Sequence, residues 1–450
     1  MSEVIKIRKG LNIKLKGQAD KILLQAPGSK TYAVKPVDFQ SLVPSITAKP
    51  CEEVKVGSTL FCDKYRPEIK YSSPVSGKVL SILRGERRRI IAVVVEDDGN
   101  HTALEFRKGD PEGMTREQVV QNLLESGMWP MIRQRPYNIV AGPEDTPKAI
   151  FISGFDTAPL APDYDFIMKD QMDDFQWGIN ALKKLTPGKI HLNQDVTVPS
   201  VKTFANVRHV QLNNFSGPHP AGNVGIQIHH IDPINKNEKV WVVQPQEVAA
   251  IGRLFKTGRY DPQMIVALTG SEVKKPLYYR VIRGAEVASI VDGNVHEGDV
   301  RLISGNVLQG SSVAADGHLG YFAYQLTAIP EGRHFEMFGW MMPGLKKFSA
   351  SRTFLSWLMP NKRYRLDTNM HGGERAYVMT GEYNRVLPMD ILPVQLIKSI
   401  LVQDFDKMEQ LGIYEVCEED LALCEFVCTS KIPVTSILRQ GLDAIRKEME

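Results

Sequence analysis

An alternation of apolar runs and helix-like segments between residues 149 and 260 constrains the fold of this chain more than any other feature. Residues 149–155 (AIFISGF) form a continuous apolar run of the kind found in buried strands. A helix is predicted next from apolar residues at helical spacing and a glycine stop, namely Met172, Phe175, Ile179, Leu182 and Gly188. Further strands are predicted at 189–193, 204–213, 239–244 and 264–270, with a helix through Val248, Ile251 and Phe255 that ends at Gly258. Because such alternation favours a mostly parallel sheet covered by helices, the sequence predicts an α/β domain over residues 101–260.

The chain before this domain has the pattern of short strands. Residues 30–100 alternate apolar and polar positions between glycines and prolines. The segments 54–61 (VKVGSTLF) and 73–79 (SPVSGKV) resemble the barrel-sandwich domains of biotinyl and lipoyl carriers, which predicts such a domain over residues 1–100. Lys64 lies where a carrier would present its modified lysine, but no methionines flank it. A structural role is therefore preferred for Lys64 over cofactor attachment.

The sequence pattern changes twice after residue 260. Residues 261–330 read as short strands with turns, and residues 331–450 as a mainly helical domain. Within the latter, one helix is predicted through Ile397, Leu401, Phe405 and Met408 before Gly412, and a final one through Leu438, Leu442, Ile445 and Met449. Nearer the start of the α/β domain, Thr115 and Gln118 form a capping box for a helix that Gly127 ends.

Bulk composition excludes several classes of protein. Hydrophobic residues make up 43% of the 450 residues and the net charge is +3, so no strong field points to nucleic acid. The basic run at 84–89 (RGERRR) is expected to be a solvated hairpin rather than an anion site. No apolar run reaches the roughly eighteen residues of a membrane span, and the first residues lack a signal-peptide pattern. Five cysteines, an odd and sparse number, favour a reducing compartment and a cytoplasmic location.

The segment 213–233 (NNFSGPHPAGNVGIQIHHIDP) concentrates glycine, proline and histidine. Gly217 and Gly222 have the spacing of a phosphate loop, but Asn223 and Val224 stand where lysine and Ser/Thr are required. Two prolines also remove amide donors that such a loop uses. No G-x-G-x-x-G sequence follows any predicted strand, so the dinucleotide fingerprint is absent as well.

A metal site in this segment is not expected either. If residues 224–230 form a strand, His229 and His230 point to opposite faces, so at most one could join His219. The remaining interpretation is a rigid loop that contacts a ligand or a partner. The residues assigned to it are His219, Pro220, Gly222 and Gly225.

Several segments together resemble a known family. They are 217–233 (GPHPAGNVGIQIHHIDP), 240–261 (VWVVQPQEVAAIGRLFKTGRYD), 73–88 (SPVSGKVLSILRGERR), 151–168 (FISGFDTAPLAPDYDFIM), 332–356 (GRHFEMFGWMMPGLKKFSASRTFLS), 383–393 (YNRVLPMDILP) and 418–428 (EEDLALCEFVC). In this order they are similar to the A-subunit family of the Na⁺-translocating NADH:quinone reductases. The resemblance implies a peripheral subunit on the cytoplasmic face of the inner membrane, docked on membrane-embedded partners, chiefly the B subunit. It implies support of electron transfer from NADH to quinone coupled to Na⁺ export. NADH, flavins and iron would be held by other subunits, and ubiquinone or menaquinone would be a ligand at the level of the complex.

A more distant similarity extends to the C subunit of the Rnf complex and to the NADH-binding subunit of respiratory complex I. It implies that the α/β domain is Rossmann-like, that residues 261–330 form a ubiquitin-like β-grasp module, and that an iron–sulfur domain is the counterpart of the C-terminal region. Cys417, Cys424 and Cys428 are spaced x₆ and x₃, whereas a bacterial 4Fe–4S site uses C-x₂-C-x₂-C-x₃-C-P. Three thiolates cannot supply four ligands, so the cysteines are expected to be buried apolar residues.

The sequence thus predicts no catalytic residue and no metal site in this chain. Phe338, Trp340 and Met341 form an apolar cluster that is assigned, with the loop at 219–225, to quinone or partner contact, although core packing is the common fate of such clusters. The alternative function is an independent flavin- or NADH-binding oxidoreductase that uses the α/β sheet.

Overall fold

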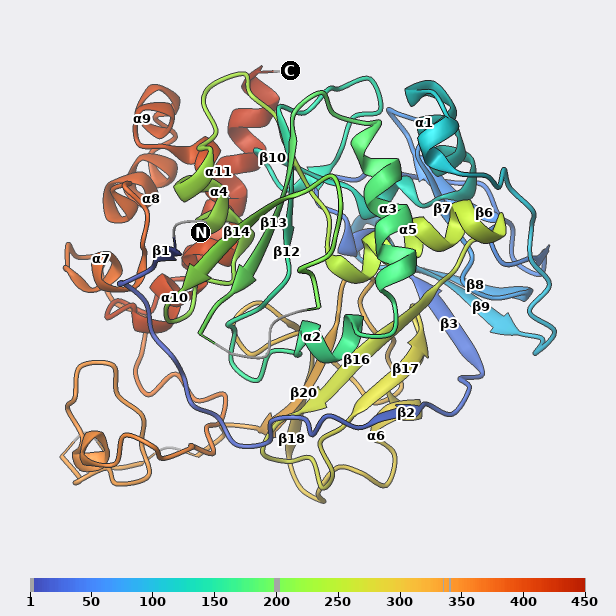
Figure 1. Ribbon diagram of the computed structural model, residues 1–450. Coiled ribbons are helices and arrows are strands. Elements are labelled where there is room, and N and C mark those ends of the chain that lie inside the picture. The colour runs from blue at the N-terminus through green and yellow to red at the C-terminus, as the bar shows by residue number, and fades with distance from the viewer. Residues whose placement is uncertain (1–3, 198–202, 335, 340, 450) are drawn as a thin grey trace.

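The computed structural model describes residues 4–197, 203–334, 336–339 and 341–449. Four β-sheets and a helical C-terminal region build the described chain (Figure 1). Trp340 lies outside the described residues. No helix among the described residues is long and apolar enough to cross a membrane.

Two small antiparallel sheets form the N-terminal β region. One has the order β3-β9-β8-β5, with β3 (Thr31–Val34), β9 (Ile90–Asp97), β8 (Gly77–Arg84) and β5 (Glu53–Val54). The other has the order β4-β6-β7, with β4 (Pro44–Ile46), β6 (Thr59–Asp63) and β7 (Lys70–Ser72). Val79, Val93 and Val95 share one buried core with Leu60 and Phe61, so the two sheets pack on each other.

The central sheet has seven strands in the order β1-β14-β13-β12-β15-β10-β11. The strands are β1 (Val4–Lys6), β14 (Gln211–Ser216), β13 (Lys189–Asp195), β12 (Ala149–Ser153), β15 (Val240–Val242), β10 (Arg133–Arg135) and β11 (Ile139–Val140). The first five run parallel, β10 pairs antiparallel with β15, and β11 pairs antiparallel with β10. Along the chain the strand order moves outward from β12 to β14 and then returns to β15 on the other side, so β12 and β15 flank a topological switch point.

Helices cover both faces of this sheet. The helices are α2 (Tyr164–Met168), α3 (Met172–Lys183), α4 (Val224–Ile231) and α5 (Pro245–Thr257). Helix α1 (Arg116–Ser126) lies instead beside β7 and the turn at Trp129–Met131. Alternate residues of β12 show the two layers, because Ile150 and Ile152 pack with α3 and α5, whereas Phe151 packs with α4. The sequence predicted α1 correctly, including its capping box and the stop at Gly127.

The fourth sheet has six strands in the order β19-β18-β20-β16-β17-β2. Its strands are β16 (Gln263–Thr269), β17 (Tyr278–Ile282), β18 (Val300–Ser304), β19 (Ser311–Val313), β20 (Gln325–Pro330) and β2 (Leu23–Gln25), and α6 (Ala288–Val291) packs against it. The described residues between 331 and 381 have little regular structure apart from a 3₁₀ helix at Leu355–Leu358. The C-terminal helices are α7 (Glu382–Val386), α8 (Pro393–Leu401), α9 (Phe405–Gln410), α10 (Glu418–Val427) and α11 (Val434–Met449).

The first strands of the chain belong to the later sheets. β1 pairs in parallel with β14, and β2 pairs in parallel with β17. Ile7, Ile13 and Leu15 also lie in the core of the C-terminal helices. The predicted boundaries at 100, 260 and 330 stay a prediction, and the segment before β3 packs with elements beyond the first of them.

Four local predictions were wrong. Residues 224–230 form helix α4 instead of a strand, because Val224, Ile228 and Ile231 make one helical face against the sheet. Helix α3 ends at Lys183, and Gly188 lies beyond it, directly before β13. The helix predicted through 397–408 is split into α8 and α9, because Gln403 has φ 57° and the Asp404 side chain caps α9. The strand predicted at 204–213 begins only at Gln211.

Candidate functional site

A buried polar junction lies at the carboxyl end of the central sheet, near the switch point. Three segments meet there, namely the loop after β12, the loop before α4 and the start of α10, and the side chain of Arg135 reaches them from β10. In open α/β sheets this edge is where ligands bind. The side chains that occupy it therefore decide what the sheet can still hold.

Thr157, in the loop after β12, forms hydrogen bonds with the loop before α4. The Gly222 amide donates a hydrogen bond to Thr157 Oγ1 at 2.9 Å, and Nδ1 of His219 lies 3.1 Å from the same oxygen. Ser153 Oγ donates to the Gly222 carbonyl at 3.1 Å. A Cβ on Gly222 would lie 2.5 Å from the Thr157 nitrogen and 2.9 Å from the Asp156 Cα, so only glycine fits between these two loops.

A chain of buried amides continues beneath the loops. Gln227 Nε2 donates to Ser153 Oγ at 2.7 Å, and Asn193 Nδ2 donates to Gln227 Oε1 at 2.7 Å. Asn213 Nδ2 donates to Asn193 Oδ1 at 2.8 Å. These side chains come from β12, β13, β14 and α4, so the network joins the sheet to the helix that the sequence did not predict.

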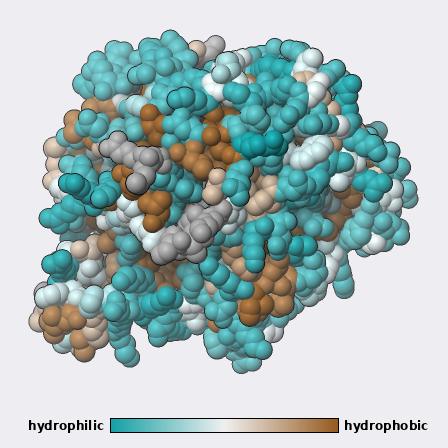
Figure 2. All heavy atoms as spheres, viewed as in Figure 1, coloured by the Kyte–Doolittle hydropathy of each residue, from teal (hydrophilic) through white to brown (hydrophobic). Residues whose placement is uncertain are grey.

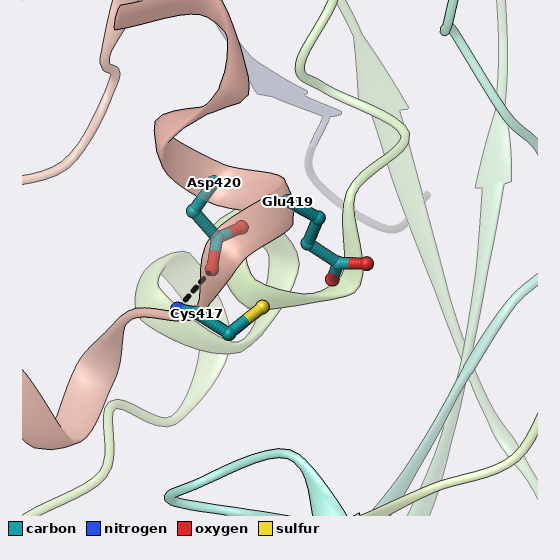
Figure 3. A group of neighbouring side chains, drawn as sticks. All are labelled: Cys417, Glu419 and Asp420. Carbon is teal, nitrogen blue, oxygen red and sulfur yellow. Dashed lines mark hydrogen bonds between the residues drawn. The ribbon is translucent and has the colours of Figure 1, made fainter. Parts of the chain in front are cut away.

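The start of α10 closes the junction with the side chains of Cys417, Glu419 and Asp420 (Figure 3). Arg135, at the end of β10 and only 3% exposed, pairs with Glu419 at 2.6 Å and approaches Asp420 at 3.8 Å. The Cys417 amide donates to Asp420 Oδ2 at 3.0 Å. Asn223 Nδ2 donates to the Glu419 carbonyl at 2.8 Å. The C-terminal helical region thus covers this edge of the sheet with its own polar side chains.

Burial dominates the electrostatics of the junction. It raises the pKa of Asp420 to about 7, with the Glu419 charge adding to the effect, and it raises the pKa of Asp156 to about 6. Burial also lowers the pKa of His219 to about 4, so this imidazole is neutral at physiological pH. Its Nε2 has no hydrogen-bond partner among the described residues.

Cys417, Glu419 and Asp420 bring one sulfur and two carboxylates within 4.8 Å of one another, the one such set within the part of the chain that is described. The two carboxylates bind the guanidinium group of Arg135, and the set suits this cation better than a metal ion. Arg135 already supplies a cation to both carboxylates, and burial raises the pKa of the Cys417 thiol and so keeps it protonated. Cys424 and Cys428 are buried elsewhere along α10 and its end and do not join this set.

The structure separates the residues that the sequence assigned to quinone or partner contact. His219, Pro220, Gly222 and Gly225 are buried together in the junction, where a Cβ on Gly225 would lie 2.3 Å from Asp420 Oδ2. Phe338 and Met341 are 57% and 66% exposed on a different part of the molecule. The loop residues contact the C-terminal region of the same chain, and a role toward a partner stays a prediction for them.

The other two histidines of the segment lie on α4. His229 Nδ1 lies 2.7 Å from Glu415 Oε2, and its Nε2 lies 3.1 Å from the Asp390 amide nitrogen, so it joins α4 to the C-terminal region. His230 contacts the carbonyl of Ile226 within its own helix. The prediction that they point to opposite faces of a strand was wrong, because the segment is a helix.

Sequence reasoning missed Arg135, Glu419 and Asp420. The acidic run after Cys417 does signal a helix start, since acidic residues favour the first turn. Nothing in the sequence around Arg135 indicates that its partner Glu419 lies 284 residues further along the chain.

A second feature is an exposed apolar lobe, which we call the methionine-rich surface. It comprises Met337, Phe338, Met341, Met342, Leu345, Leu355, Trp357, Leu358 and Met359, each 38% to 84% exposed. The lobe projects at the lower left of Figures 1 and 2, where brown spheres gather. Met337, Met342, Pro343 and Leu345 help to line a hollow of about 550 Å³. Lys346 and Arg352 add exposed positive charge at its edge.

Lys64 lies between β6 and β7, exposed, with its amide bonded to the Val43 carbonyl and its ammonium 5.9 Å from the Tyr65 ring. The neighbouring Arg66 pairs with Asp63 at 3.2 Å and reaches the Val140 carbonyl. These contacts tie the segment to the α/β domain and support a structural role for it.

Comparison with known proteins agrees with this architecture. Residues 5–98 match the NqrA N-terminal barrel-sandwich hybrid domain, residues 114–260 the NqrA second alpha/beta domain, and residues 265–315 the NQRA C-terminal domain. The protein is therefore of a multidomain class, with a barrel-sandwich domain, an α/β domain and a further domain before its helical region. The barrel-sandwich prediction is confirmed.

Whole-length relatives specify the family. The chain is 40% identical to the A subunit of the Na(+)-translocating NADH-quinone reductase of Neisseria meningitidis serogroup A, over 99% of this chain and 100% of the relative. Relatives of the same name from Yersinia pestis bv. Antiqua and Photorhabdus laumondii are 40% and 39% identical over the same shares. The chain belongs to the A-subunit family of the Na(+)-translocating NADH-quinone reductases.

Solved structures add little. The NAD⁺-reducing NiFe-hydrogenase in its H₂-reduced state aligns with a TM-score of 0.40 and 10% identity, over 76% of this chain and 62% of that one. A likeness at this level carries no argument about fold or function.

Proposed function

We propose that this chain is a peripheral, non-redox subunit of a Na⁺-translocating NADH:quinone reductase and that it docks on membrane-embedded subunits through the methionine-rich surface. The observation that carries the proposal is that large apolar side chains are exposed together on one lobe. The chain also belongs to a family of reductase subunits. Contiguous exposed apolar patches on otherwise polar proteins mark interaction sites. Methionine suits such a surface because its flexible side chain adapts to a partner.

The rest of the assignment follows from the family. The partner is chiefly the B subunit, the chain lies on the cytoplasmic face of the inner membrane, and its work supports electron transfer from NADH to quinone coupled to Na⁺ export. Ubiquinone or menaquinone is a ligand of the complex, and Phe338 and Met341 on the docking lobe are positioned to contribute to its pocket. NADH, flavins and iron are held by the other subunits.

The same proposal covers the finer fold assignment. The strand order of the central sheet, with β12 and β15 at a switch point, supports a Rossmann-like domain. The mixed sheet of β16 to β20 with α6 against it supports a β-grasp module. The polar junction supports a scaffold whose ligand edge is now used to bind its own C-terminal region.

Co-purification tests the docking role. In a tagged chain expressed with the other subunits, changing Met337, Phe338, Met341 and Met342 to serine is expected to lower recovery of the partners at least about tenfold, because the apolar contact area is lost. The matched control changes the exposed Ile22, Leu401 and Val402 to serine and should leave recovery unchanged. Equal recovery with both variants would contradict the proposal. A photo-crosslinker at position 341 should report the B subunit as the neighbour.

The alternative is an independent flavin- or NADH-binding oxidoreductase, which the central sheet favours by its topology alone. The purified chain would then carry flavin at stoichiometric level, visible in absorbance and fluorescence. We expect no such signal, because Arg135, Glu419 and Asp420 occupy the edge where the ligand would lie.

A further inference from the structure

The hairpin of β8 and β9 has a surface that neither the polar junction nor the methionine-rich surface uses. Each strand is eight residues long. Val79, Val93 and Val95 hold the inner part of the hairpin in the core. The turn between the two strands, residues 85–89, forms the other end of the hairpin, opposite the paired Gly77 and Asp97.

The extended end of the hairpin is strongly basic. Arg84, Arg87, Arg88 and Arg89 are all exposed around the turn, with Glu86 as the one acidic residue among them. Within the described ranges, none of these four guanidinium groups forms an ion pair with a carboxylate. Arg84 instead reaches the carbonyl of Arg88 at 3.3 Å. The charge is therefore free to meet an external anion.

Large apolar side chains stand beside these arginines. Leu80, Leu83 and Ile91 are 52%, 47% and 39% exposed on the two strands. The register shifts between Val79 and Ser81, which leaves Leu80 in a bulge, outside the ladder. Apolar side chains flanked by arginine suit the boundary between lipid headgroups and acyl chains.

Charge is also segregated along the hairpin. The acidic residues Glu96, Asp97 and Asp98 lie at the inner end, opposite the arginines. The arginine end can therefore approach a flat anionic surface while the carboxylates stay away from it.

We propose that the β8–β9 tip binds the anionic surface of a phospholipid bilayer, with the arginines on the headgroup phosphates and Leu80, Leu83 and Ile91 inserted between them. This contact goes beyond the docking on partner subunits, because it uses other residues and another kind of partner. It gives the chain a second, electrostatic attachment to the membrane.

Vesicle co-sedimentation of the purified full-length chain tests the proposal. Vesicles of phosphatidylcholine with phosphatidylglycerol are compared with vesicles of phosphatidylcholine alone, at low and high salt. Binding is expected only to the anionic vesicles, and it should weaken as salt rises. Changing the four arginines to glutamine is expected to weaken binding at least about a hundredfold, since each arginine near such a surface contributes roughly fivefold.

A matched control changes the exposed Lys16, Lys274, Lys275 and Arg280 to glutamine, which lowers the net charge equally, and it should keep full binding. Changing Leu80, Leu83 and Ile91 to serine should weaken binding at both salt concentrations. Thermal unfolding confirms that each variant is folded. Lack of binding by the unchanged chain, or equal binding by the arginine variant and the control, would overturn the proposal. Neither result bears on co-purification with partner subunits, so this inference and the docking proposal fail separately.

Discussion

Gly222 is a residue whose replacement the polar junction cannot accept. In Gly222→Val the new side chain meets backbone atoms of Asp156 and Thr157, which cannot move without breaking the Ser153 and Thr157 hydrogen bonds. We expect a loss of about 2–3 kcal/mol in the free energy of unfolding, measured by denaturant titration. Gly28→Val is the control, since no atom lies within 4 Å of its added Cβ. A Gly222 variant as stable as the control would show that the loops separate easily.

Arg135 is expected to be worth more to stability than the exposed ion pairs of this chain. Arg135→Met leaves the Glu419 carboxylate without its cation at the buried junction, which should destabilise the chain by about 3 kcal/mol. Arg135→Met combined with Glu419→Gln should cost less than the two single changes added together. A double-mutant cycle on the midpoint of thermal unfolding measures this coupling, and strict additivity would argue against a direct pair.

Asp420 makes stability depend on pH. Its pKa is raised from an ordinary 3.8 to about 7, so between these values the folded chain holds a proton that the unfolded chain has released. Stability should therefore fall as pH rises through this window and level off above it. Asp420→Asn should flatten the dependence of the unfolding midpoint on pH between about 4 and 7, while the exposed Asp292→Asn should not. An unchanged slope would contradict the assignment.

At the scale of elements, the capping box that the sequence predicted for α1 can be tested by mutation. Thr115 Oγ1 accepts from the Gln118 amide, and Gln118 Oε1 accepts from the Thr115 amide at 3.2 Å. Thr115→Ala should cost about 1 kcal/mol. Hydrogen exchange should show faster exchange in the first turn of α1 only, because α3 and α5 have their own packing. Exchange that rises throughout the α/β domain would show instead that the cap stabilises the whole domain.

Elements with local signals could be predicted from the sequence. α1 and α5 have caps and glycine stops, and β12 is a continuous apolar run, so their assignment needed no distant partner. α4 could not be predicted, because its short apolar run satisfies both a strand and a helix. Its long face packs on Phe151 and Val242, which only the folded sheet brings together.

The candidate site also has one part that the sequence predicted and another that it did not. The glycines and prolines at 217–225 indicated a shaped loop, and the structure has one. The acidic partner of that loop, the start of α10, comes from the far end of the chain, and a single sequence does not show which arginine meets which carboxylate. The loop's burial under α10 was therefore beyond prediction, as was the pairing of β1 and β2 with strands far along the chain.

At the scale of the whole molecule, the methionine-rich surface should be a point of proteolytic attack on the isolated chain. Lys346, Arg352 and Arg363 are exposed in a region with little regular structure. Limited trypsin digestion should cut there before it cuts within the central sheet, and assembly with the partner subunits should slow that cut at least about tenfold. Mass spectrometry of the fragments identifies the site. Cleavage that is as fast in the complex as in the isolated chain would place this lobe outside the interface.

The pairing of β1 with β14 and of β2 with β17 also orders events on the ribosome. The strands β1 and β2 emerge first, yet neither can find its neighbour until Gln211–Ser216 and Tyr278–Ile282 have been translated. The barrel-sandwich strands can assemble in the meantime, while the leading segment waits in an extended, aggregation-prone state. The earliest strands of this protein can therefore complete their pairing only after Tyr278–Ile282 has been translated.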